Sequence, residues 1–459
     1  MKSNSVSRPA GALTRRAGGL LFVALLLGSV GAGGQAVSAR SLANGRLGAG
    51  SHATLAGQTI RLGVWANPVE FSFYAKLVAP FEAQTGAKIK IEYTDYNTYW
   101  TKLPTQLAAG TAADVVLINN NLDLQQQSHI FADLNPYMRT SKLSLSNYLP
   151  DPFQLYTYQG GLYAAPVNVT IQLLMYNKEL LAKAGVSAPT ESWTWNDLVT
   201  AAIKLTLDKN GKHPNQPGFD VRTVVQWGFW PSYDSESFWD PIIAQNKGTM
   251  IDPRTHKYNF EDPSTVVALQ WMHDLAWKYH VMPGATAASH VKADPFISGR
   301  AALSMQGSYM VIQYLQQISK FKWDVAPLPH QKTWATNDGG IAMAVNRASS
   351  NQQAAWELIR YVISQQAQLY WGSHREGVPI LRSAMASFFT APPASAPTIL
   401  REMTHVINPS LSDAWAATKN GLKIQDGVNN QIALLLNDKS TAAQTARAID
   451  TLANALLNQ

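Results

Sequence analysis

Residues 162–185, Leu-Tyr-Ala-Ala-Pro-Val-Asn-Val-Thr-Ile-Gln-Leu-Leu-Met-Tyr-Asn-Lys-Glu-Leu-Leu-Ala-Lys-Ala-Gly, decide the fold of this chain. The apolar run Val167–Met175 is typical of a buried strand, and a short helical pattern follows it directly. Asn177 stands at the N-cap position of that helix, and Gly185 stands where a left-handed residue ends it. A second helix is predicted from Thr194-Trp195-Asn196-Asp197, which has the pattern of a capping box. A strand that leads into two helices predicts an α/β domain.

Length and composition predict a folded chain with at least two domains. A chain of 459 residues is longer than one hydrophobic core supports. A hydrophobic fraction of 46% with only 15% charged residues is the opposite of the balance found in disordered chains. The net charge of +7 depends on the first 39 residues, because without their four basic residues 33 basic residues face 30 acidic ones. Since no long run of Lys or Arg occurs elsewhere, we expect no nucleic-acid partner.

The first 39 residues predict an export signal. A basic region ends at Arg15-Arg16, the apolar core Leu20–Leu27 follows, and Val37-Ser38-Ala39 fits a cleavage site. Thr14-Arg15-Arg16 also fits a twin-arginine signal, so both export routes stay open. The apolar core is shorter than a membrane span needs. We therefore expect an exported protein, in the periplasm or at the extracellular face of the cytoplasmic membrane.

The chain contains no cysteine. Disulfides, thiolate metal sites and a cysteine nucleophile are therefore excluded. The lipid-modified cysteine that anchors many exported proteins to the membrane is also missing. We expect the mature chain to be free, or to be held by an uncleaved N-terminal segment. Residues 40–57, rich in Ser, Gly and Ala, predict a flexible leader.

Beyond residue 58, strand and helix patterns alternate. Strands are predicted at Ile60–Val64, Ile89–Tyr93 and Val115–Ile118, and helices at Phe71–Thr85 and Tyr99–Ala109. This order indicates a parallel sheet covered on both faces. The alternation continues with longer insertions, and further elements are predicted at Ala301–Met305, Ile341–Val345, Gln352–Ser364 and Thr441–Leu457.

The predicted strand ends carry aromatic and amide side chains. These are Trp65 and Asn67, Tyr96 and Asn97, and Asn119 with Asn120. Ligands of doubly wound sheets bind beyond the carboxyl ends of the strands. Flat apolar faces beside amides suit a neutral polyhydroxylated ligand, and no glycine-rich phosphate motif follows these strands. Each asparagine could instead be only a turn former or a helix cap.

A second concentration of aromatic residues lies at Trp227–Trp239 and is followed by Asp240. Its mixed polar and aromatic residues around a proline predict a loop-borne binding wall. The wall would use Trp230, Tyr233, Trp239 and Asp240. Core packing stays the alternative explanation, above all for Phe229 and Phe238. The turns at Gly307-Ser308-Tyr309 and at Gly339 add candidates, because glycine permits close backbone approach to a ligand.

Enzyme signatures are scarce. No G-x-S-x-G elbow and no H-E-x-x-H helix occurs, and the ten histidines are scattered. A glycosidase needs two carboxylates on one sugar bond, and Asp234, Glu236 and Asp240 are the acids beside the aromatic cluster. We interpret them first as acceptors for ligand hydroxyls. We expect no enzyme activity, no cofactor and no metal.

The Tyr-Asn-Lys turn at residues 176–178 and the following Trp-Thr-Trp helix start resemble the crossover of extracellular solute-binding proteins of the maltose-binding type. Other segments resemble the same family in the same order: Ala113–Val116, Phe131–Leu134, Phe296–Met305, Ala344–Asn346 and Arg375–Pro379. The resemblance implies an α/β, two-lobed periplasmic-binding-protein type II fold. Each lobe would be a mostly parallel sheet flanked by helices, with hinge segments near Pro166, Pro327 and Gly377. Residues 58–166 and 327–376 would form the N-terminal lobe, and residues 167–326 and 377–459 the C-terminal lobe.

The same resemblance implies the binding component of an ABC importer, which delivers a carbohydrate, an oligosaccharide, to a membrane permease. The expected ligand-binding residues are Trp65, Asn67, Asn97, Asn119 and Asn120 from one lobe, Trp230, Tyr233, Trp239, Asp240, Gly307, Ser308, Tyr309 and Gly339 from the other, and Tyr163, Trp371 and Arg375 near the crossings. We expect a monomer. A glycerol phosphodiester, polyamine or peptide as the ligand, an exported carbohydrate-active enzyme, and a scaffold protein stay open as alternatives.

Overall fold

The structure is a computed structural model that describes residues 55–119, 129–149, 151–252, 254–389 and 420–457. The predicted export signal, nearly all of the predicted leader, and Asn120 lie outside these residues. Within the described ranges, no helix has the length and hydropathy of a membrane span.

The first sheet contains the strands that alternation predicted. Its members among the described residues are β1 (Thr59–Trp65), β2 (Lys88–Thr94), β3 (Val115–Ile118), β6 (Ala165–Pro166) and β13 (Ala342–Val345), in the order β2-β1-β3-β13-β6. β1 pairs in parallel with β2 and β3, whereas β13 is antiparallel to β3 and β6. Ile60, Leu62 and Val64 are fully buried, as their alternation requires. Helices α2 (Pro68–Thr85), α3 (Tyr96–Ala108), α13 (Gln352–Val362) and α14 (Gln365–Ser373) accompany this sheet.

Helix α3 begins earlier than predicted. Asp95 is its N-cap and accepts a hydrogen bond from the Thr98 N–H at 3.0 Å. Tyr96 and Asn97 therefore lie in the first turn of a helix, and the prediction of a strand-end loop there was wrong. The cap decides this boundary because an aspartate satisfies one of the four N–H groups that a helix start leaves unpaired.

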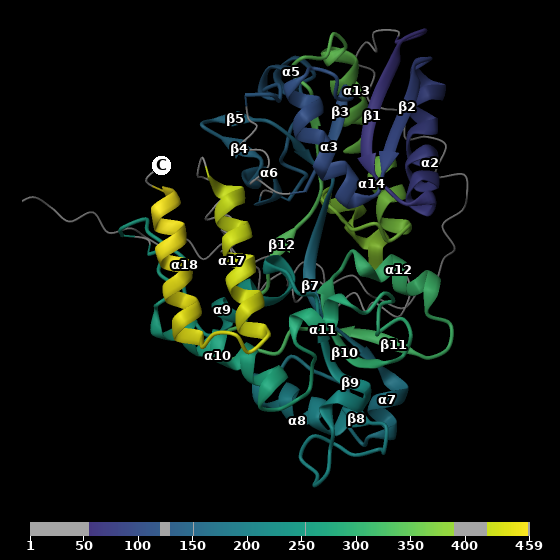
Figure 1. Ribbon diagram of the computed structural model, residues 1–459. Helices are drawn as coiled ribbons and strands as arrows, with labels where there is room; N and C mark the ends of the chain where they lie inside the picture. The colour runs from purple at the N-terminus through teal and green to yellow at the C-terminus, as the bar shows by residue number, and fades with distance from the viewer. Residues whose placement is uncertain (1–54, 120–128, 150, 253, 390–419, 458–459) are drawn as a thin grey trace, which may run out of the picture. The chain divides into compact units, whose positions relative to one another are not determined.

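Strand β7 (Asn168–Asn177) is buried along its whole length and carries the chain out of the first sheet (Figure 1). The Asn177 side chain caps α7 (Lys178–Lys183) by accepting from the N–H groups of Glu179 and Leu180, and Gly185 has φ +63°. Thr194 and Asp197 form the predicted capping box at the start of α8 (Trp195–Leu205). These predicted boundaries are confirmed.

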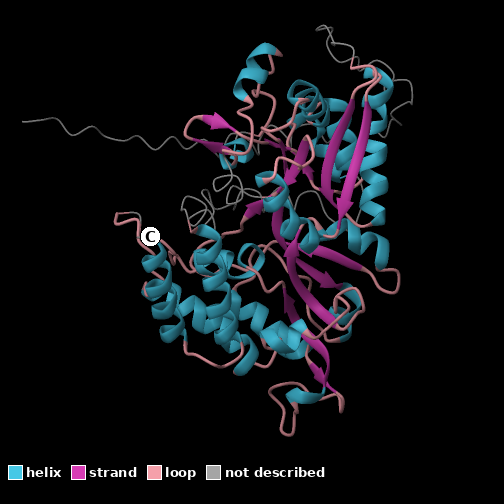
Figure 2. Cartoon of the chain, turned by 45° about the horizontal axis from the view of Figure 1, so that its top comes forward, coloured by secondary structure: helices cyan, strands magenta, loops and turns pink. Residues whose placement is uncertain are grey.

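The second sheet is built around β7. The described residues give it the order β11-β7-β10-β9-β8, and two short strands also pair with β7; their bounds are β8 (Leu207–Asp208), β9 (Val224–Pro231), β10 (Ala301–Gly307), β11 (Trp323–Ala326), β12 (Asp338–Gly339) and β14 (Val378–Pro379). The α/β class is confirmed, and helices accompany both groups of strands (Figure 2). The prediction of a mostly parallel sheet is wrong here, because β9 and β10 are parallel while β8, β11, β12 and β14 pair antiparallel. β7 runs away from the first sheet. The strands that pair with it, β10, β11, β12 and β14, run in the opposite direction.

The second crossing between the sheets lies at residues 340–341 and not near Pro327. Residues after β11 stay with second-sheet elements: His330 bridges to Thr194, and the N–H groups of Lys332 and Thr333 donate to the Gln245 carbonyl. β12 still pairs with β7, and β13 is the first strand back in the first sheet. The crossing could not be located from periodicity, because residues 327–337 form hydrogen bonds without a regular helix or strand.

The remaining helices pack beside these sheets. Their bounds, with those of two short strands and three helical turns, are α5 (Asn135–Thr140), α6 (Asp151–Leu155), β4 (Thr157–Tyr158), β5 (Gly161–Leu162), η3 (Val221–Thr223), η4 (Ser235–Trp239), α9 (Asp240–Gln245), α10 (Pro263–Trp277), α11 (Ala285–Ser289), α12 (Met310–Gln317), η5 (Arg382–Phe389), α17 (Gly421–Leu436) and α18 (Ala442–Leu457). Helices α17 and α18 lie side by side and pack on α10 (Figure 1). β14 and η5 pack against α14, although the predicted lobe boundary at residue 377 separates them from it.

Candidate functional site

An aromatic cluster lies at the carboxyl end of β1. The ring centroid of Trp65 is 5.6 Å from that of Tyr96, 5.3 Å from that of Tyr99 and 5.6 Å from that of Trp100. Tyr96 is 49% exposed, and Trp65 is partly buried against the core. Trp65 was predicted for this position. Tyr96 was expected at a strand end and lies instead in the first turn of α3, and Trp100 was not predicted, because its place on α3 depends on the Asp95 cap.

Asn119, at the end of β3, joins this cluster. Its Nδ2 donates to the Tyr96 hydroxyl at 2.8 Å, while its buried Oδ1 has no hydrogen-bond partner. Asn67 and Glu70 cap the start of α2 reciprocally, because the Asn67 N–H donates to Glu70 and the Glu70 N–H donates to Asn67 Oδ1. Asn97 is exposed in α3. The structure thus brings Asn119 to Trp65, and the capping interpretation holds for Asn67.

The three crossings between the sheets meet at Asn168. Its Oδ1 accepts from the Ile341 N–H at 2.8 Å, and its Nδ2 donates to the Glu376 carbonyl at 3.0 Å. A Cβ on Gly340 would lie 2.4 Å from the Asn168 carbonyl oxygen, and a Cβ on Gly377 would lie 2.3 Å from Asn168 Nδ2. Both glycines are therefore required by the close approach of other chain segments to this one residue.

Acidic and basic groups adjoin the third crossing. Burial, together with the nearby Glu70 carboxylate, raises the pKa of Glu376 to about 8. Arg375 is 6% exposed, its guanidinium lies 5.4 Å from the Phe388 ring centroid, and burial lowers its pKa. Its φ of +63° is a left-handed conformation that a residue with a Cβ rarely adopts.

Two other predicted residues near the crossings take part in packing. Trp371 is 1% exposed and packs edge-on against Phe73 and Tyr74. This burial leaves no face of the Trp371 ring for a ligand. Tyr163 is partly buried, and its ring lies where a Cβ on Gly161 would come within 2.8 Å of it.

A polar group lies where β7 meets the segment before β12. The alternation of a strand places Asn168, Thr170 and Gln172 on one side of β7. Gln172 is fully buried; its backbone N–H donates to Thr336 Oγ1 at 3.2 Å, and both of its side-chain amide atoms lack a partner. Asn337 is also fully buried, and its Nδ2 donates to Asp240 Oδ2 at 3.1 Å while its Oδ1 has no partner.

Gln172 contacts the residue next to Asn337, because Thr336 Oγ1 bonds both the backbone N–H and the backbone carbonyl of Gln172. β12 pairs with β7 in a register that sets Asp338 opposite Ile171. If the same register continued by one residue, Asn337 would lie opposite Gln172, on the same side of the sheet. Each buried polar atom left without a partner costs about 1–3 kcal/mol, and folded proteins pair nearly all such atoms. These unpaired amide atoms therefore indicate a place where a polar ligand group completes the hydrogen bonding.

The predicted turn at residues 307–309 adjoins this group. Ser308 is fully buried; its N–H donates to the Ile171 carbonyl at 2.7 Å, and its Oγ accepts from the Ile171 N–H at 3.2 Å. Tyr309 is 40% exposed, and its ring covers Gly307. Tyr309 itself thus occupies the space beside Gly307 that was expected to admit a ligand. Gly339 pairs with Thr170 of β7.

The segment 227–240 is not a loop-borne wall. Val224–Pro231 forms strand β9 beside β10, and Ser235–Trp239 forms a π-helical turn, so the loop prediction was wrong. The alternating strand and the turn bury Phe229 and Phe238 completely and leave Trp239 2% exposed. Core packing, the alternative explanation, therefore holds for Phe229 and Phe238 and extends to Trp239.

Two other aromatic residues of this segment, Trp230 and Tyr233, are more exposed than Trp239 or are hydrogen-bonded to a neighbouring segment. Trp230 is 8% exposed, and its ring centroid lies 6.4 Å from that of Tyr233. The Tyr233 hydroxyl donates to the Pro283 carbonyl at 2.7 Å, and burial raises the pKa of Tyr233. Asp240 begins α9 and is fully buried. Asp240 accepts a hydrogen bond from Asn337. Because it is fully buried, it is not a hydrogen-bond acceptor on the protein surface.

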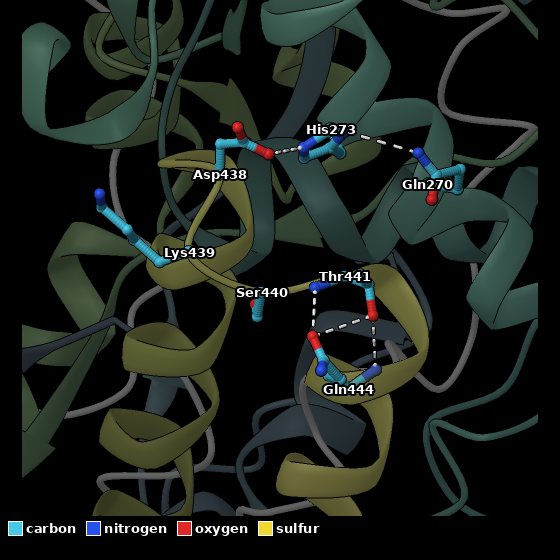
Figure 3. A pocket seen from close by; sticks show the side chains of 7 residues that line it. All are labelled: Gln270, His273, Asp438, Lys439, Ser440, Thr441 and Gln444. Carbon is cyan, nitrogen blue, oxygen red and sulfur yellow. Dashed lines mark hydrogen bonds and ion pairs between the residues drawn. The ribbon is translucent and has the colours of Figure 1, made fainter.

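A surface pocket of about 350 Å³ lies elsewhere, between α10 and the turn that joins α17 to α18 (Figure 3). Its lining residues are Gln270, His273, Asp438, Lys439, Ser440, Thr441 and Gln444. His273 Nε2 lies 2.9 Å from Asp438 Oδ1, which ties α10 to that turn. None of the residues predicted to bind ligand lines this pocket. Among the described residues, no group of His, Asp and Glu side chains could hold a metal ion.

Comparison with known proteins agrees with this architecture. Residues 65–369 match the family model of the bacterial extracellular solute-binding proteins. The arabinooligosaccharide-binding protein of Bacillus subtilis is 26% identical over 310 residues, which cover 64% of this chain and 67% of that protein.

Two solved structures are similar. An ABC substrate-binding protein from Listeria monocytogenes in complex with cycloalternan has a TM-score of 0.76 at 23% identity, covering 87% of this chain and 99% of that chain. Maltose-bound MalE3 of T. maritima has a TM-score of 0.72 at 22% identity, covering 87% of this chain and 100% of that chain. Both likenesses show the two-lobed type II fold of periplasmic binding proteins. The matched family model spans most of the chain, and the protein therefore belongs to the bacterial extracellular solute-binding proteins.

Proposed function

We propose that this protein is the exported binding component of an ABC importer and that it binds a carbohydrate, an oligosaccharide, between its two lobes. The observation that carries the proposal is the aromatic cluster of the partly buried Trp65 and the exposed Tyr96, with the unpaired amide oxygen of Asn119 beside it. Sugar rings present C–H faces to aromatic rings and hydroxyls to amides.

The second lobe contributes amides of the same kind. Gln172 and Asn337 hold buried amide atoms that need a neutral partner able to donate and accept. Trp239 and Trp371 are left out of the proposed ligand wall, because their rings pack within the hydrophobic clusters of the chain. Cycloalternan and maltose, the ligands named for the two similar structures, are consistent with this choice of ligand class.

We propose that the two lobes close on the ligand by rotating about the three chain crossings at Asn168. We place residues 55–167 and 341–389 in the first lobe, and residues 168–340 and 420–457 in the second. A ligand that contacts both lobes shifts the equilibrium toward the closed form, and the closed form docks on the permease. The protein acts as a monomer and delivers its ligand without catalysis. Export through the N-terminal signal completes the proposal.

A binding screen with the purified protein tests this function. Maltotriose, mannotriose and arabinotriose represent the sugars, and glycerophosphoglycerol, spermidine and a tripeptide represent the other solute classes. The proposal predicts a raised melting temperature with at least one trisaccharide, because a ligand that binds only the folded state stabilises it by mass action. Stabilisation by the other solutes alone would contradict it. Product release from the trisaccharides would favour an enzyme.

A further inference from the structure

Gln172 differs from the other fully buried glutamines whose contacts the structure describes. Gln245 Oε1 accepts from Trp195 Nε1 at 2.7 Å, and its Nε2 donates to the Ala335 carbonyl at 2.9 Å. Gln368 is likewise bonded through both amide atoms, to the chain at Val167 and at Ile380. Gln172 has no partner for either atom, although it is fully buried as they are. The difference indicates that the partner of Gln172 comes from outside the chain.

We propose that Gln172 and Asn337 form a subsite in the second lobe that binds a neutral hydroxyl group of the ligand. This inference rests on the proposed function. The backbone of Gln172 is held by Thr336 Oγ1, which accepts from its N–H, and the Asn337 side chain is held by Asp240, which accepts from Asn337 Nδ2. Because the Asn337 donor is engaged with Asp240, its Oδ1 remains as an acceptor. The subsite thus offers the Gln172 NH₂ as donor and the two amide oxygens as acceptors.

A hydroxyl group matches this set, since it donates one hydrogen bond and accepts others. An ammonium group donates only, and it would leave the Gln172 NH₂ without an acceptor. A phosphate or carboxylate accepts only, and it would meet the two amide oxygens and the Asp240 carboxylate. Within the described ranges, no lysine, arginine or histidine side chain hydrogen-bonds to Gln172, Thr336 or Asn337. The subsite therefore selects an uncharged hydroxylated ligand over a polyamine or a phosphodiester.

The position of the subsite also fits a role in specificity. Gln172 lies opposite Gly307 in the pairing of β7 with β10, one residue before the buried Ser308. Thr170 and Gly339, on the same strands, lie between this subsite and Asn168. A ligand held here contacts the strand that runs through the crossings. Binding at this point thus adds affinity only for ligands long enough to reach the second lobe.

The test replaces Gln172 by methionine, which keeps the length of the side chain and removes both amide atoms. Calorimetry measures the affinity for whichever of maltotriose, mannotriose and arabinotriose the wild type binds best, and thermal melting without sugar measures stability. The inference predicts at least a tenfold loss of affinity, about 1.4 kcal/mol, with an unchanged or raised melting temperature. The matched control Gln245→Met should lower the melting temperature and keep the affinity within threefold.

The outcomes separate the two proposals. If the wild type binds a sugar and Gln172→Met binds it with the same affinity, the subsite proposal is wrong while the proposed carbohydrate function still holds. Binding of none of the three sugars by the wild type overturns the function and the subsite with it. If Gln172→Met does not fold, Gln172→Asn retracts the amide by one methylene, and the same tenfold loss is expected. Unchanged affinity of that variant would also overturn the subsite.

Discussion

The side-chain oxygen of Asn168 accepts a hydrogen bond from the backbone N–H of Ile341 at 2.8 Å. The same side chain donates to the Glu376 carbonyl at 3.0 Å, so one amide joins three crossings that are far apart in the sequence. These two hydrogen bonds hold the three crossing segments together at Asn168, so the lobes can rotate about this residue without separating there. The hinge proposed for this protein is therefore centred on Asn168.

Replacing Asn168 by alanine should lower the free energy of unfolding by about 2–4 kcal/mol. The change leaves the Ile341 N–H and the Glu376 carbonyl without their partner, and each such buried group costs about 1–3 kcal/mol. Urea denaturation measures the effect. Asn430→Ala, at an exposed position of α17, is the control and should change stability by less than about 0.5 kcal/mol. Similar values for the two variants would contradict the role of Asn168.

Gly377→Ala should destabilise the protein by about 3 kcal/mol or more, because φ is +150° and the new Cβ would meet Asn168 Nδ2 at 2.3 Å. Gly211→Ala is the control that measures the cost of a positive φ alone, without a steric clash. Gly211 also has a positive φ, of +74°, but nothing lies within 4 Å of the Cβ position. Its substitution should cost about 1–2 kcal/mol. Denaturant titration of both variants checks the difference, and equal losses would show that Asn168 gives way.

Glu376→Gln should change the dependence of stability on pH. The folded pKa of about 8 is raised above the usual value of 4.5, so between these pH values the folded state holds a proton that the unfolded chain has released. Wild-type stability should therefore fall as pH rises from 4.5 to 8 because of this group, and the glutamine variant should lack that part of the fall.

Melting temperatures of wild type and Glu376→Gln at pH 4, 6 and 8.5 measure the Glu376 contribution. The two proteins should be equal in stability at pH 4, and the variant should gain progressively at the higher values. Glu70→Gln removes the neighbouring carboxylate and should give a smaller gain. A difference between Glu376→Gln and wild type that is constant across pH would contradict the raised pKa.

Tyr96→Ala should lower the affinity for a bound trisaccharide by about tenfold and change stability little, because the side chain is 49% exposed and an aromatic ring can stack on a sugar. Calorimetric titration measures the affinity. Trp277→Ala is the control, since Trp277 is 41% exposed on α10, which carries none of the candidate site residues. Equal affinities of wild type and Tyr96→Ala would remove the aromatic cluster from the site.

Local patterns predicted much of the fold, because caps and periodicity act over a few residues. Asn177, Gly185 and the capping box at Thr194 stand where their chemistry requires, and the alternation at Ile60–Val64 marks β1. The second sheet was harder to predict. Its antiparallel pairings depend on which segments, distant in sequence, pair with β7. Local periodicity in the sequence carries no information about such long-range pairing.

The sequence predicted some of the residues that the structure brings together, and whether they bind ligand stays a prediction. Trp65 and Asn119 follow predicted strands, and that rule brings them together. The burial of Trp239 and Trp371 was not predicted, because an aromatic residue in a polar context can still be covered by distant elements. Gln172 was missed, although it is one of three polar residues that alternate with apolar ones along this strand. Its importance depends on the absence of a partner, which only the packed structure reveals.

Calorimetric titration of the purified protein with maltotriose, mannotriose and arabinotriose tests the central claim most directly. The account predicts saturable binding of at least one of them at one site per chain, weakened about tenfold by Tyr96→Ala and by Gln172→Met. Binding of spermidine or glycerophosphoglycerol, with no heat from any of the sugars, would contradict it.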